Sequence, residues 1–589
     1  MHKRNYIIAD SGSFREYKSL LGSGGWKWVF IGTDPLLQDS IQKELSYDYN
    51  YPFAQELQEI CHKNKQLFLD LLADYLSYQD VHITNSTNTA YKNPLTSDIF
   101  LNFCFYFFIK ERIMEKKDKI IFLVEDSSLI RTCLLTLKNQ DCEIRFKNKN
   151  FILPKSKLFI SCHSRLLYKF VISIFLWAYN KLFYRDHYKQ VEQKLQQVQI
   201  VFFTWVEDRS FQELTGLFVD PYVGKLKEYY SGMGFSSLFL TLPLLSIDNL
   251  KKSYSSGDLC PCINYLSPID MLSAFLKTFF FKWKKIKGSF SFSTFELLFA
   301  SEKKWDKQDM YLALLQYKAC KRLFSLQNLD GKYVIYPFEN QPWDKMMLLA
   351  IKESKVKCKT VGYQHTTIPH FMMNYFLGKD ETDILPQPDI IVANGEHWRK
   401  VLKKSGFSSI IKNGGSLRYV SFQSSECHID KLKSILEVKG KNILVLLSYS
   451  IFYSIDLISY LLRNNAEDMN FLIKPHPNYP ERIIRKYFPK LPSNFTFVHG
   501  SMSECMEIVS FAIHTGTTAA VECMMSGINV IKYLPERIDL DPLLDTGFKQ
   551  HVITNKDVLN ISEIQKGSSI DSSLIAEPFV AITWKEILK

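Results

Sequence analysis

The stretch FAIHTGTTAAVECMMSG, residues 511–527, has the pattern of a buried strand, a tight turn and a helix. The apolar residues at 511–513 favour a strand, and residues 519–525 have good helix-forming composition. A strand that opens through a short turn into a helix is the building unit of a parallel α/β sheet. This stretch therefore predicts an α/β fold for the part of the chain around it.

The turn within this stretch has the chemistry of a phosphate site. Thr515, Gly516, Thr517 and Thr518 lie between the strand and the helix. Free backbone N–H groups and the positive end of the helix dipole favour an anion there, and threonine hydroxyls add donors. Glu522 lies one helical turn after Thr518 and is placed to accept hydrogen bonds from ribose hydroxyls. The alternative is ordinary N-capping by Thr517 or Thr518, with Glu522 in solvent.

A second motif, FLIKPHPNYPER at 471–482, places His476 between two prolines at the end of another apolar strand. Proline fixes its own φ and restricts the residue before it, so the imidazole is held in one direction. In an open parallel sheet the carboxyl ends of the strands share one edge, where ligands bind. Lys474, His476 and the threonine turn should therefore converge on one anionic site, such as the phosphate of a nucleotide. The alternative is that His476 is a loop residue that caps a neighbouring helix.

Working outward, short apolar runs alternate with helical patterns through most of the chain. They predict an accessory N-terminal α/β domain at 1–150, then a basic amphipathic helical connector at 151–195. Two Rossmann-like domains follow at 196–412 and 413–589, the second ending in a C-terminal helix. The glycine pair in NGGSLRYVSF, 413–422, suits a hinge, so we expect closure around residues 396–422.

The middle domain carries the candidates for acceptor binding and proton transfer. In YPFENQPW, Glu339 follows an apolar strand and is accompanied by Asn340, Gln341 and Trp343, which are candidates for binding the acceptor. A carboxylate at a strand end can take a proton from a sugar hydroxyl.

His365 in GYQHTT ends the next strand, and the adjacent Gln364 can bind hydroxyls. Glu339 and His365 compete for the role of base, with Asp208 in VEDR as a third candidate. The alternatives are a salt bridge for Glu339 and a structural hydrogen bond for His365.

Composition and charge narrow the classes of protein and partner. The 589 residues are 46% hydrophobic and 23% charged, which is typical of globular protein, and the net charge of +12 favours acidic partners. The twelve cysteines have no zinc-site spacing, and the first residues have no signal-peptide pattern. We therefore expect a cytoplasmic protein without a metal or a bound cofactor.

Two segments that are rich in aromatic residues and lysine predict contact with a membrane surface. In 166–185 an uncharged apolar core of ten residues, 170–179, is flanked by basic residues, and 275–292 holds five lysines among aromatic residues. The core is too short to span a bilayer but suits a helix that lies at the interface. The second segment also suits stacking of single-stranded nucleic acid, and the two together are compatible with a buried helix and a basic loop.

The motifs KPHP, FVHG and TGTTAAVE resemble the donor half of GT-B glycosyltransferases of bacterial surface carbohydrates. YPFENQPWDKMML and GYQHTTIPHFMMNYF are similar to the surface carbohydrate biosynthesis protein family, which is related to Kdo and sialic-acid transferases with a His-Pro motif. The resemblance covers roughly 196–565 and implies a GT-B fold, in which two Rossmann-like domains face a cleft. It implies that His476 and Thr517 or Thr518 bind a CMP phosphate. The acidic-acidic-Gly motif of those families is missing here, which leaves the base open.

This resemblance and the residues lead to a functional expectation. We expect a metal-independent glycosyltransferase that moves Kdo or another nonulosonic acid from a CMP-sugar onto a glycan or lipid-linked glycan. The setting would be capsule or lipopolysaccharide synthesis, in the cytoplasm and peripheral to the inner membrane. The alternatives are a CDP-polyol phosphotransferase, a sugar epimerase, a nucleic-acid-binding protein and a non-catalytic scaffold, although no clustered RNA motif favours nucleic acid.

Overall fold

The architecture comes from a computed structural model of the chain. Described are residues 5–22, 24–115, 118–138, 140, 142–145, 155–207, 210–211, 217–223, 226–242, 246–284, 286, 290–299, 307–327, 329–417, 441–465, 468–499, 501–544, 546, 548, 550–561 and 577–589, without the side chains of 155–162, 290–292 and 308.

Three separate sheets organise these residues, and every pairing between their strands is parallel. Their strand orders are β2-β3-β1-β4, β11-β10-β9-β8-β5-β6-β7 and β14-β13-β12-β15-β16-β17. Most strands are buried along nearly their whole length, as expected where helices cover both faces of a parallel sheet. The predicted fold class is confirmed: two Rossmann-like domains face a cleft in the GT-B manner, beside an additional N-terminal α/β domain.

The middle sheet is formed by the apolar runs that the sequence marks as strands, together with two short strands that it does not. Its strands are β5 (Ile200–Thr204), β6 (Ser237–Thr241), β7 (Leu259–Pro261), β8 (Tyr333–Pro337), β9 (Lys359–Tyr363), β10 (Ile390–Ala393) and β11 (Ile410–Asn413). Strands β7 and β11 form its two edges. The helices around it include α14 (Lys307–Leu326), α15 (Pro342–Ser354) and α16 (Glu396–Lys404).

The C-terminal sheet brings the two motifs of the opening argument to one edge. Its strands are β12 (Lys441–Leu446), β13 (Met469–Lys474), β14 (Phe495–Phe497), β15 (Phe511–His514), β16 (Asn529–Tyr533) and β17 (His551–Ile553). Strands β13 and β15 both pair with β12, so that Leu446 is level with Lys474 on one side and with His514 on the other. The loop that carries His476 and the turn before α21 (Thr518–Met525) therefore start at the same rim.

The chain crosses between the middle and C-terminal domains at two adjacent segments. Gly414 and Gly415 follow β11, and the returning segment at 577–580 hydrogen-bonds to this region: Val580 N donates to Gly414 O at 3.0 Å and Ser416 N donates to Glu577 O at 2.7 Å. A Cβ on Gly415, whose φ is +70°, would lie 2.0 Å from Pro578 O. The glycine pair thus allows close packing at this crossing. The predicted hinge at 396–422 stays a prediction, and its residues 418–422 lie outside the described residues.

The predicted C-terminal helix is present, but it packs on the middle domain. Helix α22 (Ala581–Ile587) returns to the middle domain, where Trp584 is buried against β9 and β10. The indole N–H of Trp584 donates to Gly414 O at 2.9 Å, and Tyr230 OH donates to Trp584 O at 3.1 Å. Burial of the apolar Trp584 side chain thus fixes α22 to the middle domain, although β11 of that domain ends more than 160 residues earlier in the sequence.

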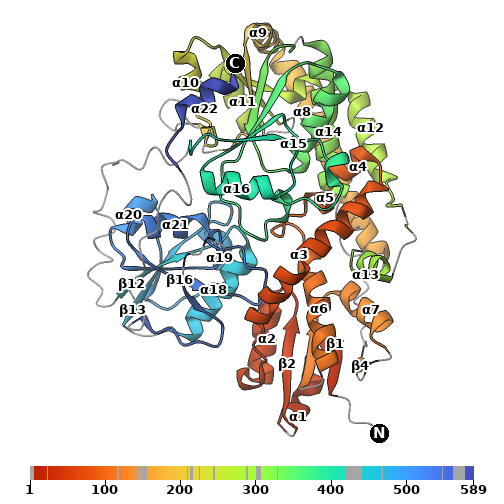
Figure 1. Ribbon diagram of the computed structural model, residues 1–589, viewed down its shortest axis with the longest axis vertical. Helices are drawn as coiled ribbons and strands as arrows, with labels where there is room; N and C mark the ends of the chain where they lie inside the picture. Colours follow the sequence, from red (N-terminus) through yellow and green to blue (C-terminus); the bar gives the residue numbers. More distant parts are fainter. Residues whose placement is uncertain are drawn as a thin grey trace.

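The N-terminal domain bridges the other two domains. Its sheet contains β1 (Tyr6–Asp10), β2 (Trp26–Ile31), β3 (Lys119–Val124) and β4 (Cys142–Arg145). Two of its helices, α3 (Ala54–Ser77) and α6 (Ile99–Glu115), pack against each other. Helix α3 (Ala54–Ser77) leads from this sheet towards the middle domain (Figure 1). The Gln58 side chain on α3 donates to Arg537 O at 2.7 Å and accepts from Asp539 N at 2.9 Å in the C-terminal domain.

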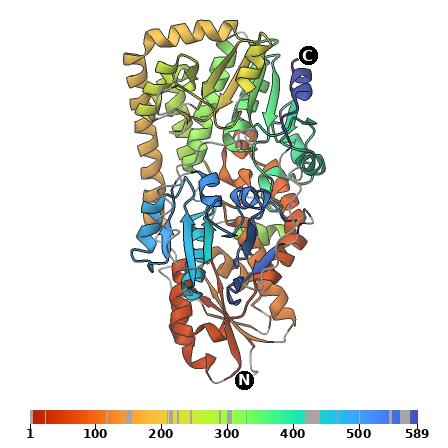
Figure 2. The ribbon, with the colours of Figure 1, turned by 90° about the vertical axis from the view of Figure 1, so that its left-hand side faces the viewer.

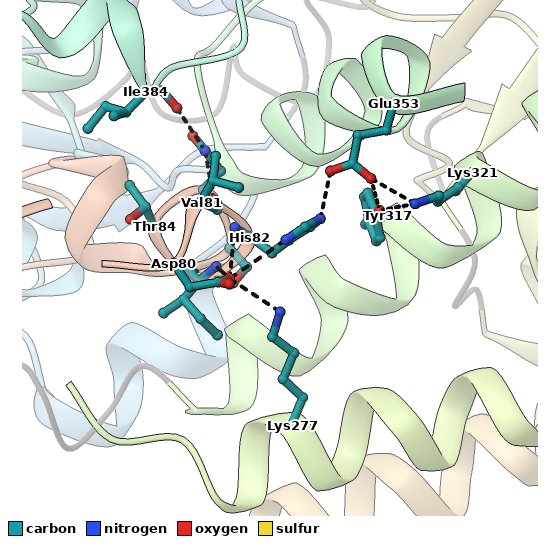
Figure 3. A network of polar contacts seen from close by, with 12 residues as sticks. Asp80, Val81, His82, Thr84, Lys277, Tyr317, Lys321, Glu353 and Ile384 are labelled. Atoms are coloured by element: carbon teal, nitrogen blue, oxygen red, sulfur yellow. Dashed lines mark hydrogen bonds and ion pairs between the residues drawn. The ribbon is translucent and has the colours of Figure 1, made fainter. Parts of the chain in front are cut away.

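Buried and half-buried ion pairs join the N-terminal domain to the middle domain. Lys92, after α5 (Asn88–Tyr91), contacts both carboxylate oxygens of Glu381 at 2.7 Å, and neither side chain is more than 3% exposed. Figure 3 shows a second network around α4 (Val81–Ser86), in which His82 contacts Glu353 at 2.8 Å and Asp80 contacts Lys277 at 3.2 Å. The task of residues 1–150, which the sequence left open, includes holding both Rossmann-like domains.

Candidate functional site

A cavity of about 1300 Å³ lies where the three domains meet. Its C-terminal wall follows the ends of β12, β13, β15 and β16, and its middle-domain wall follows the ends of β5, β8 and β9. Residues 91, 93 and 95 of the N-terminal domain complete it. This is the location at which α/β sheets bind ligands.

The turn before α21 has the geometry of an anion site. Thr517 is the N-cap of α21, with its hydroxyl accepting from Ala519 N at 3.4 Å. Gly516 has φ +105°, and a Cβ there would lie 2.8 Å from Leu540 C and 2.9 Å from Asp541 N. Only glycine fits this close approach in this backbone region. Gly516, Thr517, Thr518 and Glu522 all line the cavity.

A buried histidine beneath this turn holds its shape. Gly516 N donates to His514 Nδ1 at 3.0 Å, and His514 Nε2 lies 3.1 Å from Gln550 Oε1. Burial lowers the pKa of His514, although the nearby Asp541 carboxylate opposes this. The neutral ring can therefore accept from Gly516 on one nitrogen and donate to Gln550 with the other.

His476 lies on the same rim as the threonine turn, and both line the cavity. Its Nδ1 accepts from Asn478 N at 3.2 Å, so in the neutral ring the hydrogen is on Nε2. Tyr449 packs edge-on against the imidazole with ring centroids 5.4 Å apart. Lys474, two residues earlier, also lines the cavity. An imidazole N–H, an ammonium group and a helix N-terminus thus face one volume, an arrangement suited to a phosphate.

Across the cavity, Glu339 and His365 form a pair. Glu339 Oε1 lies 3.3 Å from His365 Nε2, and the side chains are 18% and 5% exposed. Burial raises the pKa of Glu339 to about 8, and the neighbouring carboxylates of Asp344 and Glu207 add to the effect. A carboxyl group with a pKa near neutrality is an efficient proton acceptor at physiological pH.

The two halves of the site are in contact. Thr367, two residues after His365, has its hydroxyl 3.4 Å from the hydroxyl of Thr518 at the start of α21. The ring of Tyr222 packs edge-on against His365 with centroids 4.9 Å apart, and its hydroxyl hydrogen-bonds to Glu207. The proton-accepting pair and the anion site therefore belong to one cavity and not to two.

Several predicted site residues lie elsewhere. Thr515 is 2% exposed and does not line the cavity, because it lies on the buried side of the turn. Asn340 is 2% exposed and donates to Asn374 O at 2.7 Å, which fixes the loop behind Glu339. Trp343 is packed edge-on against Trp205, with centroids 4.6 Å apart, and has a core role.

Gln364 is also buried, and its Oε1 accepts from Asn394 N at 3.0 Å. Among the four residues predicted to bind the acceptor, Gln341 alone lines the cavity, and Asn340, Trp343 and Gln364 are corrected to structural positions. Asp208 lies outside the described residues.

Other lining residues were not predicted. Ser448 and Tyr449 follow β12, and Glu207 follows β5, so the strand-end rule that identified His476 applies to them as well. Tyr91 and Asn93 come from the N-terminal domain, and Asn93 Nδ2 donates to Tyr91 OH at 2.8 Å. Nothing in the local sequence marks these two, because their position depends on the docking of a separate domain.

Metal ligands are not grouped in the part of the chain that the structure describes: no cluster there has three or more His, Cys, Asp or Glu side chains placed to hold an ion. The ten cysteines whose side chains are described are free, and nine of them are buried, among them Cys260 in β7 and the nearby Cys262. Lys474 is the one lysine or arginine among the described residues that line the cavity.

Comparisons with protein families and with curated proteins found no match. Solved structures that resemble the chain include the glycosyltransferase SnogD from Streptomyces nogalater, with 12% identity over 66% of this chain and 95% of that one, at a TM-score of 0.33. Another is a UDP-N-acetylglucosamine 2-epimerase from Listeria monocytogenes, with 10% identity over 57% of this chain and 79% of that one, at 0.32. A third is an α,α-trehalose 6-phosphate synthase from Burkholderia multivorans, with 10% identity over 61% and 86%, at 0.33. The strand order of the three sheets defines the fold of this chain.

Proposed function

We propose that the chain is a glycosyltransferase that moves a sugar from a nucleotide-sugar to a hydroxyl group of a glycan acceptor. One observation carries this proposal: a single cavity combines an anion site on the C-terminal domain with a buried carboxyl–imidazole pair on the middle domain. Transfer of a sugar from a nucleotide requires both, because a hydroxyl must lose a proton while a phosphate leaves with negative charge.

In this mechanism the donor phosphate lies between His476, Lys474 and the N-terminus of α21. The acceptor oxygen attacks the anomeric carbon, and the bond from that carbon to the phosphate oxygen breaks. The electron pair leaves with the nucleotide, whose charge is stabilised by the cationic side chains and the N–H groups. The acceptor proton passes to the Glu339 carboxylate, with His365 positioned at 3.3 Å to share it.

The finer assignment is a CMP-linked donor, with Kdo or another nonulosonic acid as the sugar. Its support is the likeness of KPHP and TGTTAAVE to transferases in which the corresponding residues bind a CMP phosphate, together with the arrangement of His476 and Thr517 around one cavity. Glu522, one turn into α21, is placed to accept hydrogen bonds from ribose hydroxyls.

A thermal-shift panel of CMP, CDP, UDP and GDP, with their sugars, tests both levels of the proposal. CMP and a CMP-sugar should stabilise the protein, and His476→Ala should abolish that response. His499→Ala is the matched control, because His499 lies in the same domain, is 70% exposed, pairs with Glu481 and does not line the cavity.

The panel separates the alternatives as well. Selective stabilisation by UDP would overturn the CMP assignment and leave the transferase proposal in place. Selective stabilisation by a CDP-polyol, with phosphate transferred to the acceptor, would favour the phosphotransferase. If no nucleotide binds, or if Glu339→Gln transfers sugar at the wild-type rate, the proposed mechanism is wrong.

A further inference from the structure

Helices α8 (Lys155–Phe183) and α12 (Pro268–Phe279) form an outer face of the middle domain. They pack antiparallel, because Phe170 lies against Phe275 with ring centroids 4.6 Å apart and His163 lies against Phe279 at 4.7 Å. Figure 2 shows α8 as the orange-gold helix along the edge of the molecule. We call the solvent side of these two helices the α8–α12 surface.

The solvent side of α8 carries large apolar side chains between residues 167 and 183. Tyr168, Val171, Phe175 and Leu182 recur at helical spacing and are 63%, 56%, 55% and 77% exposed, respectively. Leu167 and Phe183 beside them are 51% and 65% exposed. An ordinary helix on the surface of a soluble domain has polar side chains in these positions.

Helix α12 repeats this pattern next to α8. Its exposed apolar residues are Ile269, Leu272 and Leu276, and Phe280 follows at its end. Ile269 is 78% exposed and Phe280 is 69% exposed. Two helices that pack together and each expose several large apolar side chains mark a surface for interaction.

Two polar side chains of α8, Ser173 and Asn180, point inward. Ser173 is fully buried and bonds to Tyr311 OH at 2.6 Å, and Asn180 bonds to Asn264 at 2.6 Å. Because these contacts satisfy the inner face, α8 is held on the domain by specific bonds. Among the described residues, 163–183 of α8 is the one segment long and apolar enough to cross a membrane, but its inner face is already occupied by the domain.

Basic residues predominate on and beside the two helices, and the one acidic residue of α12, Asp270, pairs with Arg322 at 3.1 Å. The sequence of α8 contains no Asp or Glu, Arg165 is exposed on it, and Lys277 is exposed on α12. Exposed Lys282 and Lys284 follow α12. Lysine and arginine stems can lie along apolar surface while their charged ends reach anionic headgroups.

We propose that the α8–α12 surface docks on an anionic phospholipid bilayer, with both helices parallel to the membrane plane. The exposed apolar side chains of both helices insert at the boundary between headgroups and acyl chains, and the surrounding cations contact phosphate headgroups. This arrangement holds the middle domain on a membrane without a spanning helix. It does not depend on the reaction proposed above.

Vesicle co-sedimentation tests the proposal on the full-length protein. We expect binding to phosphatidylcholine vesicles that contain phosphatidylglycerol, weak binding to phosphatidylcholine alone, and loss of binding at high salt. The triple variant Val171→Glu, Phe175→Glu and Leu276→Glu should bind at least about tenfold more weakly, because three apolar side chains are replaced by carboxylates.

The matched control is the triple variant Met114→Glu, Leu135→Glu and Val558→Glu. These residues are 64%, 60% and 79% exposed and lie on other surfaces. Because both triple variants add three glutamates, they change the net charge by the same amount. The control should keep most of the vesicle binding. Equal loss in the two variants, or binding unaffected by either, would overturn the proposal.

Light scattering during size-exclusion chromatography tests whether a second copy of the chain, instead of lipid, covers the α8–α12 surface. A dimer that the α8–α12 variant converts to a monomer, together with no vesicle binding, would overturn docking on lipid. A protein that keeps the same mass in both variants, and loses vesicle binding only in the first, supports it.

Discussion

Replacement of Glu339 by glutamine should stabilise the protein while it removes activity. Folding raises the pKa of this carboxyl group from its ordinary 4.5 to about 8. The unfolded chain therefore releases the proton at a lower pH than the folded chain, and stability falls as pH rises between these values. Glutamine has nearly the same shape but cannot ionise, so it escapes this loss.

The magnitude follows from the linkage between pKa and stability. At ~1.4 kcal/mol for each pKa unit, the carboxyl group lowers the free energy of unfolding by ~3 kcal/mol at pH 7 and by ~5 kcal/mol above pH 8. At pH 5 the difference between the two proteins should be below ~1 kcal/mol. For a domain of about 150–250 residues, such as the middle domain, ~3 kcal/mol corresponds to a rise in thermal midpoint of roughly 6–12 °C.

Two measurements check this prediction. The thermal midpoints of wild type and Glu339→Gln should diverge as the pH is raised from 5 to 9. In the activity assay, wild-type kcat/KM should rise about tenfold per pH unit and level off near pH 8, and the variant should be about 10²–10⁴-fold slower. A more stable protein with lost activity cannot be explained by misfolding.

Glu353→Gln is the control, since the surroundings of Glu353 lower the pKa of its carboxyl group whereas those of Glu339 raise it. Although burial acts against ionisation, hydrogen bonds from Lys321 and Tyr317 keep the pKa of Glu353 below its ordinary value. This carboxylate contributes stability above its unfolded pKa, so glutamine should lower the thermal midpoint across the same pH range. A constant difference between Glu339→Gln and wild type from pH 5 to 9 would refute the reasoning about Glu339.

Three further substitutions test the framework around the site. Gly516→Ala should lower the stability of the C-terminal domain by more than ~2 kcal/mol and abolish nucleotide binding. The control is Gly527→Ala, where φ is +79° and a Cβ would meet no atom within 4 Å, so the change should cost only ~1 kcal/mol of backbone strain. Calorimetry measures the stability of both variants, and nucleotide titration measures their binding. Lys92→Met should cost ~3–5 kcal/mol because it leaves Glu381 buried and unpaired, and the double variant with Glu381→Met should recover most of the loss in thermal midpoint. Gln58→Leu should cost ~1–3 kcal/mol by leaving Asp539 N without its acceptor, measured by faster hydrogen exchange at that amide.

Local sequence was sufficient for the fold class and for the edge of the sheet that binds a ligand. Residues 511–527 form a strand, a turn and a helix because each segment has the composition for its own element, and the parallel pairing follows from the helix between successive strands. Because strand ends share an edge, Lys474, His476 and Thr517 could be placed together without coordinates.

The direction in which a loop side chain points could not be obtained in this way. Glu339 and Trp343 are four residues apart, yet the first faces the cavity and the second packs on Trp205. Asn340 has φ +54° and donates to a carbonyl of another loop, so the turn depends on contacts made far along the chain. Side chains from the N-terminal domain, such as Tyr91, were beyond any local pattern for the same reason.

The N-terminal domain also explains how the site keeps its shape before a ligand arrives. It is fixed to the middle domain by the buried pair of Lys92 and Glu381, and to the C-terminal domain by Gln58. On the other side of the cleft, the chain segments at 413–417 and 577–580 are bonded to each other. The two Rossmann-like domains are thus joined at two places, and the hydroxyls of Thr367 and Thr518 meet at 3.4 Å between them.

A cavity held in this way can pre-organise its catalytic groups. Burial raises the pKa of Glu339, and the carboxylates of Asp344 and Glu207 add to this effect. If the attachment of the N-terminal domain is what closes the site, Lys92→Met should return the kinetic pKa of kcat/KM from about 8 towards the ordinary carboxyl value. An unchanged kinetic pKa in a variant whose N-terminal domain is loosened would show that the two Rossmann-like domains shield Glu339 by themselves.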